Sequence, residues 1–419
     1  MAGRCCNKRG GGKIGLSKRV AFLFLIIVLL GLTGGCWSRK ELSETAIILG
    51  AGIDREPDGK VRLTLQIARP AAFGATEGGG GGGGGGAMVG TVWVVSGTGE
   101  TVFDAQRNLS LQVSRRLYWS HNIILIFGED ASRQGVREVI NFFSRSPQPR
   151  ETMWVGVAKG KAEELLTSHS AMEKSSAQSL GFLERMKAGL FVEYKDFIRD
   201  LACPGTNPVA PRLELLYRGR HEGPVMELGP GYHKEAVLTG AAVFKDDRLV
   251  GWLDESETRG LLWLRNLIKK GAVTVPSLNE PEKKITMEII RSKTKVDPYY
   301  DGEKASFEVQ IRVDGMLIEQ QSKEVFTDPE VMAALKKSLA ADVERKARSA
   351  LEKARDDYAV DVFGFGEAFH RKYKKEWPAL KEYWDEEFAR SDVDIAVEVR
   401  IRQSGMQAGR LSIRRGAER

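Results

Sequence analysis

One cysteine near the start of the chain carries the clearest chemical signal in the sequence. Cys36 directly follows residues 33–35, Thr-Gly-Gly. Small residues before a cysteine are typical of a lipobox, in which the thiol receives a diacylglyceryl group and the chain is then cut before that cysteine. The aliphatic residue usual three places before the cysteine is missing, because Thr33 stands there and Leu32 lies one place earlier. We therefore predict lipidation of Cys36 within a lipobox that departs from the usual pattern.

The segment before Cys36 has the order of an export signal. Residues 1–19 are basic and polar, and the run from Val20 to Leu32 is apolar throughout. This run is too short to cross the hydrocarbon core, which takes about 20 helical residues, so the order predicts a lipoprotein signal peptide over residues 1–35. An uncleaved anchor helix and an ordinary signal peptide remain as alternatives. Stable anchoring takes more than one acyl chain, which a lipidated Cys36 would supply.

Most of the net positive charge of the chain lies in the segment that we expect to be removed. Six Lys and Arg residues and no Asp or Glu precede Cys36, so cleavage lowers the formal net charge from +7 by six, to +1. A nearly neutral mature chain does not support nucleic-acid binding. Cys5 and Cys6 would also be removed, which leaves Cys203 as the one internal thiol and excludes a disulfide framework.

No other set of residues has the spacing of a catalytic or metal site, and we predict no catalytic residue, no metal site and no cofactor. Cys203 is interpreted as a buried small apolar residue rather than a nucleophile. The five histidines form no His-Glu-x-x-His pair, and His121 is interpreted as a hydrogen-bonded structural histidine. The carboxylates of residues 356–357 and 385–387 are interpreted as solvated helix faces. The aromatic side chains of residues 377–388 are interpreted as core, with a membrane or partner contact as the alternative.

Strands and helices alternate along the mature chain, which predicts an α+β fold. Residues 47–54 and the alternating stretch 61–67 predict a hairpin whose second strand is exposed on one face. The nine glycines Gly78 to Gly86 predict a flexible loop, since no Lys-Ser/Thr pair follows as a phosphate-binding loop requires. Apolar spacing predicts a helix over 131–143. Asp328 before Pro329 predicts the start of an amphipathic helix that runs to Asp357.

Two stretches rich in turn-forming residues divide the chain into three predicted domains, each a mostly antiparallel or mixed sheet flanked by helices. The Pro/Gly-rich stretch 203–208 and the stretch 298–302 mark the boundaries. The predicted division is an N-terminal α+β domain over 36–204, a middle α+β domain over 205–297, a C-terminal α+β domain with the long helix over 298–405 and a basic tail over 406–419.

Several stretches of the chain, in order, resemble the Ger(x)C family of spore germination lipoproteins. The first is the junction Gly-Cys-Trp-Ser-Arg-Lys-Glu-Leu at 35–42, and Gly-Ile-Asp at 52–54 follows it. Further along are Trp-Ser-His at 119–121 and Gly-Ala-Ala-Val-Phe-Lys-Asp-Asp at 240–247. The full set of stretches is 35–42, 46–54, 119–129, 144–150, 240–253 and 257–263. The glycine run and the altered lipobox are the departures. The similarity spans essentially the whole mature chain.

The resemblance implies a non-enzymatic C subunit of a nutrient germinant receptor with a three-domain fold. It implies a place on the outer face of the spore inner membrane, held through the lipid on Cys36, beside integral-membrane A and B subunits. It does not tell whether this subunit contacts a germinant. The alternatives are a solute-binding lipoprotein of a transporter and an envelope hydrolase acting on peptidoglycan. We ranked the former second because half-exposed, alternating strands indicate antiparallel sheets rather than doubly wound lobes.

Overall fold

The computed structural model describes residues 20–22, 24, 44–69, 91–168, 170, 172–186, 189–217, 234–324, 326 and 328–403. The chain divides into two compact units, residues 1–45 and 46–419, and the elements described below lie in the second, apart from the first residue of β1. Most of the predicted signal peptide, Cys36, the glycine run and the basic tail lie outside the described residues. Within the described part of the chain, no helix has both the length and the apolar character needed to cross a bilayer.

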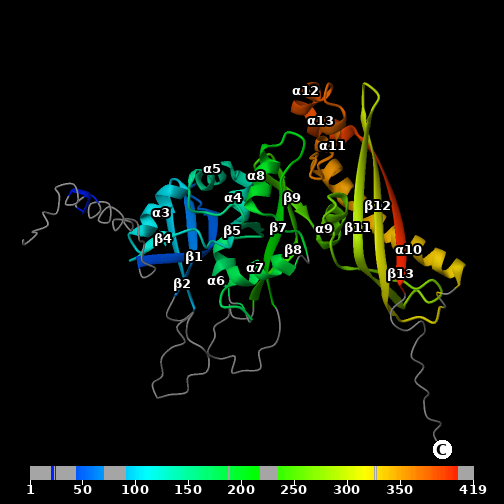
Figure 1. Cartoon of the computed structure of the whole chain (residues 1–419), viewed down its shortest axis with the longest axis horizontal. Helices are drawn as coiled ribbons and strands as arrows, with labels where there is room; N and C mark the ends of the chain where they lie inside the picture. Colours follow the sequence, from blue (N-terminus) through cyan, green and yellow to red (C-terminus); the bar gives the residue numbers. More distant parts are fainter. Residues whose placement is uncertain are drawn as a thin grey trace, which may run out of the picture. The chain divides into compact units, whose positions relative to one another are not determined.

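The first sheet has nine strands in the order β3-β2-β1-β5-β6-β7-β8-β9, with β4 paired to β1 (Figure 1). Neighbouring pairs among β1, β5, β6 and β7 are parallel, and the outer pairs on both sides are antiparallel. The strands are β1 (Thr45–Arg55), β2 (Val61–Ala68), β3 (Val92–Gly99), β4 (Arg116–Tyr118), β5 (Ile124–Phe127), β6 (Trp154–Ala158), β7 (Val209–Tyr217), β8 (Lys234–Lys245) and β9 (Arg248–Leu253).

Helices cover both faces of the first sheet. Leu125 and Phe127 pack into one buried cluster, and Ile124 and Ile126 pack into another, because successive side chains of a strand point to opposite faces. The helices are α3 (Val102–Ser110), α4 (Glu129–Gln134), α5 (Arg137–Arg145), α6 (Ala162–Thr167), α7 (Ser176–Met186) and α8 (Tyr194–Ala202). The predicted helix over 131–143 is thus two helices, which separate where Gly135 adopts a positive φ of 122°.

The prediction of a half-exposed second strand is wrong. Thr64 and Gln66 of β2 are buried as deeply as its apolar residues, at 0% and 1% exposed, and Arg62 is half-buried. Its amide donates to the carbonyl of Leu166 (2.8 Å) and accepts from the N–H of Ala177 (3.2 Å), which lie in α6 and α7. Because these helices supply hydrogen-bond partners, a polar residue can face the second core. The argument against a doubly covered sheet therefore fails for this part of the chain.

The second sheet has four strands in the order β10-β11-β12-β13, and its last pair is parallel. The strands are β10 (Ala272–Pro276), β11 (Lys284–Tyr300), β12 (Ala305–Gln320) and β13 (Asp392–Gln403), and the helices are α9 (Glu255–Leu264), α10 (Pro329–Glu352), α11 (Phe365–Lys372), α12 (Trp377–Leu380) and α13 (Trp384–Arg390). Helix α10 packs along β13 (Figure 1). Asp328 accepts the N–H of Glu330 at 2.9 Å, which confirms the predicted start, and a π-helical turn extends α10 to Asp357.

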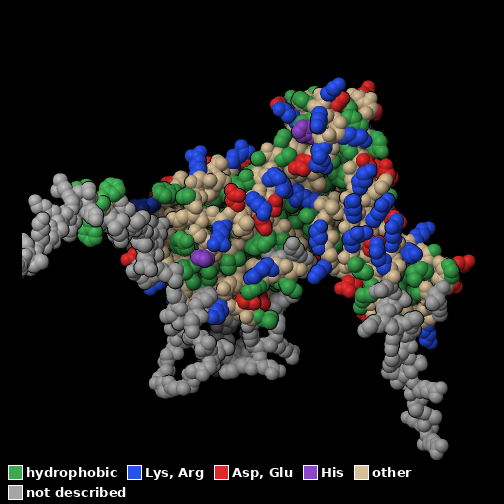
Figure 2. All heavy atoms as spheres, in the orientation of Figure 1, with side chains coloured by type: hydrophobic (Ala, Val, Ile, Leu, Met, Phe, Trp, Pro, Cys, Tyr) green, Lys and Arg blue, Asp and Glu red, His purple; other side chains and the backbone are tan. Residues whose placement is uncertain are grey.

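The face of the second sheet that bears the polar residues of β11 and β12 carries many exposed charges, seen as Lys and Arg side chains over these two strands in Figure 2. Lys293 and Lys295 of β11 and Arg312 of β12 are exposed there. Val309 and Val313 of β12, whose side chains point to the other face, are buried. This alternation is that of a strand with one face in the core and one face in solvent.

Two sheets, not three, organise the fold, so the expectation of one sheet per domain is wrong. Strands β7 to β9, which we assigned to a middle domain, continue the first sheet through the parallel pairing of β6 with β7. The expected boundary after residue 204 is a turn between α8 and β7, and β11 runs without a break across residues 297 and 298. Pro and Gly mark turns within a unit as readily as they mark boundaries between units. The α+β class itself is confirmed.

Candidate functional site

Cys36, the one residue to which the sequence assigns a chemical modification, lies outside the described residues. Its lipidation therefore stays a prediction. The other candidate residues, Cys203, His121 and the acidic and aromatic residues between 356 and 388, lie within the described part of the chain.

Cys203 lies in the loop after α8 and is half-buried and free. Burial raises the pKa of its thiol, and the nearby Glu367 carboxylate raises that pKa further. A raised pKa disfavours the thiolate, which is the nucleophilic form. The surroundings of Cys203 thus favour an unreactive thiol.

His121, which we interpreted as a hydrogen-bonded structural histidine, is exposed and lies in the loop before β5. Its ring lies 5.7 Å from that of Tyr118 and borders a cavity of about 330 Å³ that Arg150 and Arg185 also line. Among the described residues, no group of three or more His, Cys, Asp or Glu side chains could hold a metal ion.

The acidic and aromatic stretch near the end of the chain is more buried than predicted. Glu387 is buried and accepts the N–H of Ala305 at 2.6 Å, so the prediction of a solvated face is wrong for this residue. Asp385 is half-buried, and Glu386 is exposed as predicted. Trp377, Trp384 and Phe388 lie in the core, which confirms the core interpretation for these three, whereas Tyr383 is 62% exposed. Helix α13 packs against β12, and this packing brings the Glu387 carboxylate against the backbone N–H of Ala305.

Asn207 connects the two parts of the fold. It lies in the stretch 203–208 that we interpreted as a boundary. Its Nδ2 donates to Asp385 Oδ1 (2.8 Å) and its backbone N–H donates to the carbonyl of Asp361 (2.6 Å). Its Oδ1 accepts the N–H of Asp246 (2.9 Å), at the turn between β8 and β9. The side chain of Asn207 thereby joins the β8–β9 turn to α13, and its backbone N–H joins the same loop to the segment that precedes α11.

Asp361 organises the segment before α11. Its Oδ1 accepts the N–H groups of Phe363 (2.9 Å) and Gly364 (3.0 Å). Its Oδ2 accepts Gly366 N–H (2.7 Å) and Trp384 Nε1–H (3.0 Å). Complete burial raises the pKa of this carboxyl, and the four donors act in the opposite direction. The carboxylate fixes the turn that starts α11 and anchors that turn to α13.

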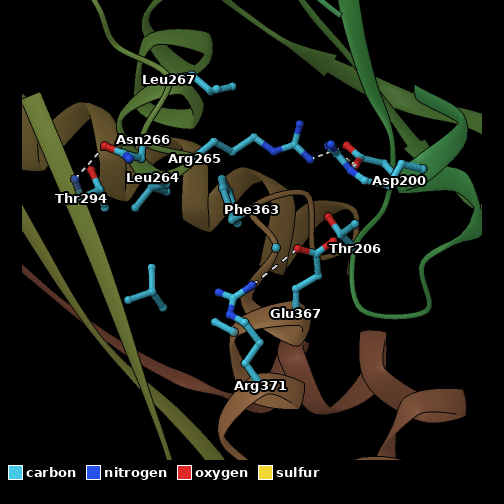
Figure 3. Close-up of a pocket in the computed structure, with 14 residues that line it drawn as sticks. Asp200, Thr206, Leu264, Arg265, Asn266, Leu267, Thr294, Phe363, Glu367 and Arg371 are labelled. Carbon is cyan, nitrogen blue, oxygen red and sulfur yellow. Dashed lines mark hydrogen bonds and ion pairs between the residues drawn. The ribbon is translucent and has the colours of Figure 1, made fainter. Parts of the chain in front are cut away.

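A cavity of about 300 Å³ lies beside this connection, between the ends of α8 and α9 and the start of α11 (Figure 3). Asp200 on α8 is 4% exposed and is shared by two arginines. Arg265 contacts its Oδ2 at 2.7 Å and Arg199 contacts its Oδ1 at 2.9 Å. Across the cavity Arg371 lies 3.7 Å from Glu367, one turn before it on α11. The walls therefore bring three arginines and two carboxylates together.

Sequence reasoning did not single out Asp200, Asn207 or Asp361. Each is an isolated polar residue in a loop or a short helix, and the segments that it joins lie far away along the chain. The one local signal was the Pro/Gly-rich composition of 203–208, and we assigned it to a boundary. A buried asparagine followed by proline could have suggested a fixed turn instead.

Most of the chain is similar to known spore germination proteins. Residues 38–215 match the family described as the spore germination protein N-terminal domain, and residues 239–405 match the one described as spore germination B3/GerAC like, C-terminal. Spore germination protein KC of Bacillus subtilis (strain 168) is 30% identical over 400 residues, covering 93% of this chain and 95% of that protein. Spore germination protein B3 of the same organism is 23% identical over 386 residues, covering 91% of this chain and 96% of that protein.

A solved structure shares the fold. The crystal structure of the GerBC protein aligns with a TM-score of 0.51 at 20% sequence identity, covering 84% of this chain and 96% of that one. At this identity the likeness concerns the arrangement of strands and helices alone.

Proposed function

Because the chain belongs to the GerAC-like family of spore germination proteins, the C subunits of germinant receptors, we propose that it is a lipid-anchored, non-enzymatic subunit of a nutrient germinant receptor. The resemblance to the Ger(x)C family noted in the sequence is confirmed. The observation that carries the proposal is the length of the match, since 93% of the chain aligns with 95% of spore germination protein KC.

The proposed place is the outer face of the spore inner membrane, with the diacylglyceryl group on Cys36 as the anchor. Support comes from the basic, apolar and small-residue order before Cys36. Several buried acyl chains hold a protein of this size at a bilayer, because each buried methylene contributes about 0.8 kcal/mol. The folded body from β1 onward would then stay in water beside the membrane.

The proposed partners are the integral-membrane A and B subunits of the same receptor. Support comes from the membership of the chain in the family of germinant-receptor C subunits. In this role the chain contributes to germination by holding or orienting its partners, and it transforms no substrate.

Gene deletion with complementation tests the proposal. In the organism that encodes the chain, we expect deletion to slow or abolish germination in response to at least one nutrient. Wild-type chain and Cys203→Ala should restore the response, because the Cys203 thiol has no assigned role. Cys36→Ala should fail to restore it and should appear in the soluble fraction of spore lysates.

Receptors of overlapping specificity can hide the effect of one deletion, so the strain should also lack the genes of its other receptors. If nutrient responses are unchanged in that background, the proposed function is wrong. If Cys36→Ala restores both the response and membrane attachment, the anchor is wrong.

A further inference from the structure

The cavity between α8, α9 and α11 has the composition of a site for a small anion. Its charged lining is Arg199, Arg265 and Arg371 with Asp200 and Glu367, so positive charge exceeds negative by one. We propose that it binds the oxyanion group, a carboxylate or a phosphate, of a small molecule. This inference goes beyond the function proposed above and does not depend on it.

Arg371 is the side chain with free donors. Its contact with Glu367, at 3.7 Å, exceeds hydrogen-bond distance, and within the described part of the chain none of its N–H groups has a hydrogen-bond acceptor. A guanidinium offers five donors arranged to fit two oxygens of a carboxylate or phosphate. Its side chain is 71% exposed, so a ligand can reach it from solvent.

Arg265 forms the opposite wall and is held in place. Its side chain is 14% exposed, and its NH2 contacts Asp200 at 2.7 Å. Arg199 already occupies the other oxygen of Asp200. Arg199 also contacts Asp196 at 2.9 Å, so both of its neighbours are carboxylates. The positive charge available to a ligand therefore comes mainly from Arg371, whose one carboxylate contact is the long one to Glu367.

Thr206 supplies an independent sign of a missing partner. It is 5% exposed, and its hydroxyl has no hydrogen-bond partner among the described residues. Figure 3 shows its side chain directed toward the same space as Glu367 and Phe363. A buried hydroxyl without a partner costs about 1–3 kcal/mol. An oxyanion in the cavity would accept its hydrogen bond and remove that cost.

The rest of the lining would strengthen this contact. Phe363 and Leu264 are buried apolar side chains that border the cavity. Apolar walls lower the local dielectric and make a charge-assisted hydrogen bond stronger than it is in water. Glu367, which can accept a donor group of the ligand, favours a molecule that carries a hydroxyl or an ammonium group near its oxyanion.

Binding can be measured on the full chain purified in detergent. We would follow thermal unfolding while inorganic phosphate or acetate replaces chloride at constant ionic strength. We expect a saturable rise of the melting temperature with at least one of the two anions, with half-saturation on the order of 1 mM or below. Comparing the two anions tells a phosphate-bearing ligand from a carboxylate-bearing one.

Two variants locate the site. Arg371→Ala should weaken the apparent affinity roughly tenfold or more. Thr206→Val keeps the shape of the side chain and removes the unpaired hydroxyl, so it should fold at least as well as wild type and still lose affinity. Arg312→Ala, which removes an exposed arginine of the second sheet, is the matched control and should bind as wild type does.

Three results would overturn the proposal: no saturable shift with either anion, a shift that Arg371→Ala and Thr206→Val both retain in full, or an equal loss in Arg312→Ala. None of these measurements reads out germination. A failed anion site would leave the receptor proposal standing, and a failed receptor proposal would leave the anion site standing.

Discussion

Asn207 and Asp385 are separated by 178 residues, yet Nδ2 of the first donates to Oδ1 of the second at 2.8 Å. The asparagine follows α8 of the first sheet, and the aspartate begins the turn of α13 that covers the second. The same asparagine also bonds the backbone of Asp361 and of Asp246. One residue, through its side chain and its backbone N–H, therefore contacts the β8–β9 turn, the segment before α11 and α13.

Replacing Asn207 with Ala should destabilise the chain strongly. The change removes the side-chain donor to the half-buried Asp385 carboxylate and the acceptor of the Asp246 N–H. We expect a loss of about 1–3 kcal/mol in the free energy of unfolding. Urea denaturation followed by tryptophan fluorescence measures the cost. Asn108→Ala is the control, because Asn108 is exposed on α3 and donates one bond, to Thr98 O; its effect should stay below about 1 kcal/mol. Equal effects of the two variants would contradict the assigned role.

Asp361→Asn should destabilise the chain although it conserves shape. Each carboxylate oxygen of Asp361 accepts two donors, so whichever oxygen becomes NH2 will face two N–H groups. We expect a loss of about 2–4 kcal/mol by the same denaturation measurement. Trp384→Phe, which removes one of the four donors at the cost of a smaller ring, should lose less. A neutral Asp361→Asn would show that the carboxylate is not needed as an acceptor.

Asp54 at the end of β1 should give the chain a measurable pH dependence. Burial raises the pKa of this carboxyl above its ordinary 3.8, while the N–H groups of Ala162 and Glu163 lower it. A carboxyl whose pKa is higher in the folded chain stabilises most below about pH 4, and this contribution is lost as pH rises through the raised value. Asp54→Asn removes the titration.

The free energy of unfolding of Asp54→Asn minus that of wild type should therefore rise with pH above about 4 and then level off. Urea denaturation in steps of pH measures this difference, from which the titration of other groups cancels. A difference that stays flat or falls would mean that the Asp54 pKa is not raised.

Gly128→Ala should disturb the same region by steric contact. A Cβ on Gly128 would lie 2.0 Å from Asp54 Oδ1, which displaces the carboxylate from the N–H groups that begin α6. We expect a loss of about 1–3 kcal/mol. Gly189→Ala is the matched control, since a Cβ there meets nothing within 4 Å, and it should change stability little. Indistinguishable melting temperatures for the two variants would contradict the close approach.

The local elements of this fold could be predicted from sequence, but their joining could not. Strands such as β12 are indicated by the alternation of apolar and polar residues, and the start of α10 is indicated by Asp328 and Pro329. Both signals depend only on residues that are neighbours along the chain. The pairing of β6 with β7, which merges two predicted domains, depends on segments separated by about fifty residues. The polar residues of β2 likewise gave no sign that α6 and α7 would cover them.

For the candidate functional residues, too, signals local in the sequence differ from relationships that only the fold creates. The signal before Cys36 is contiguous in the sequence, and its lipidation stays a prediction. Asp200, Thr206 and Arg371 could not be singled out, because they come together only where α8, α9 and α11 meet. An arginine or a threonine alone predicts no binding site.

The most direct test of the account is the mass of the N-terminal fragment of the chain extracted from spore membranes. The account predicts a fragment that begins at Cys36 and carries a diacylglyceryl group, with or without a further acyl chain on its new amino group. A fragment that contains residues 30–40 uncut, or one that begins at an unmodified Cys36, would contradict the anchor and with it the proposed place beside membrane partners.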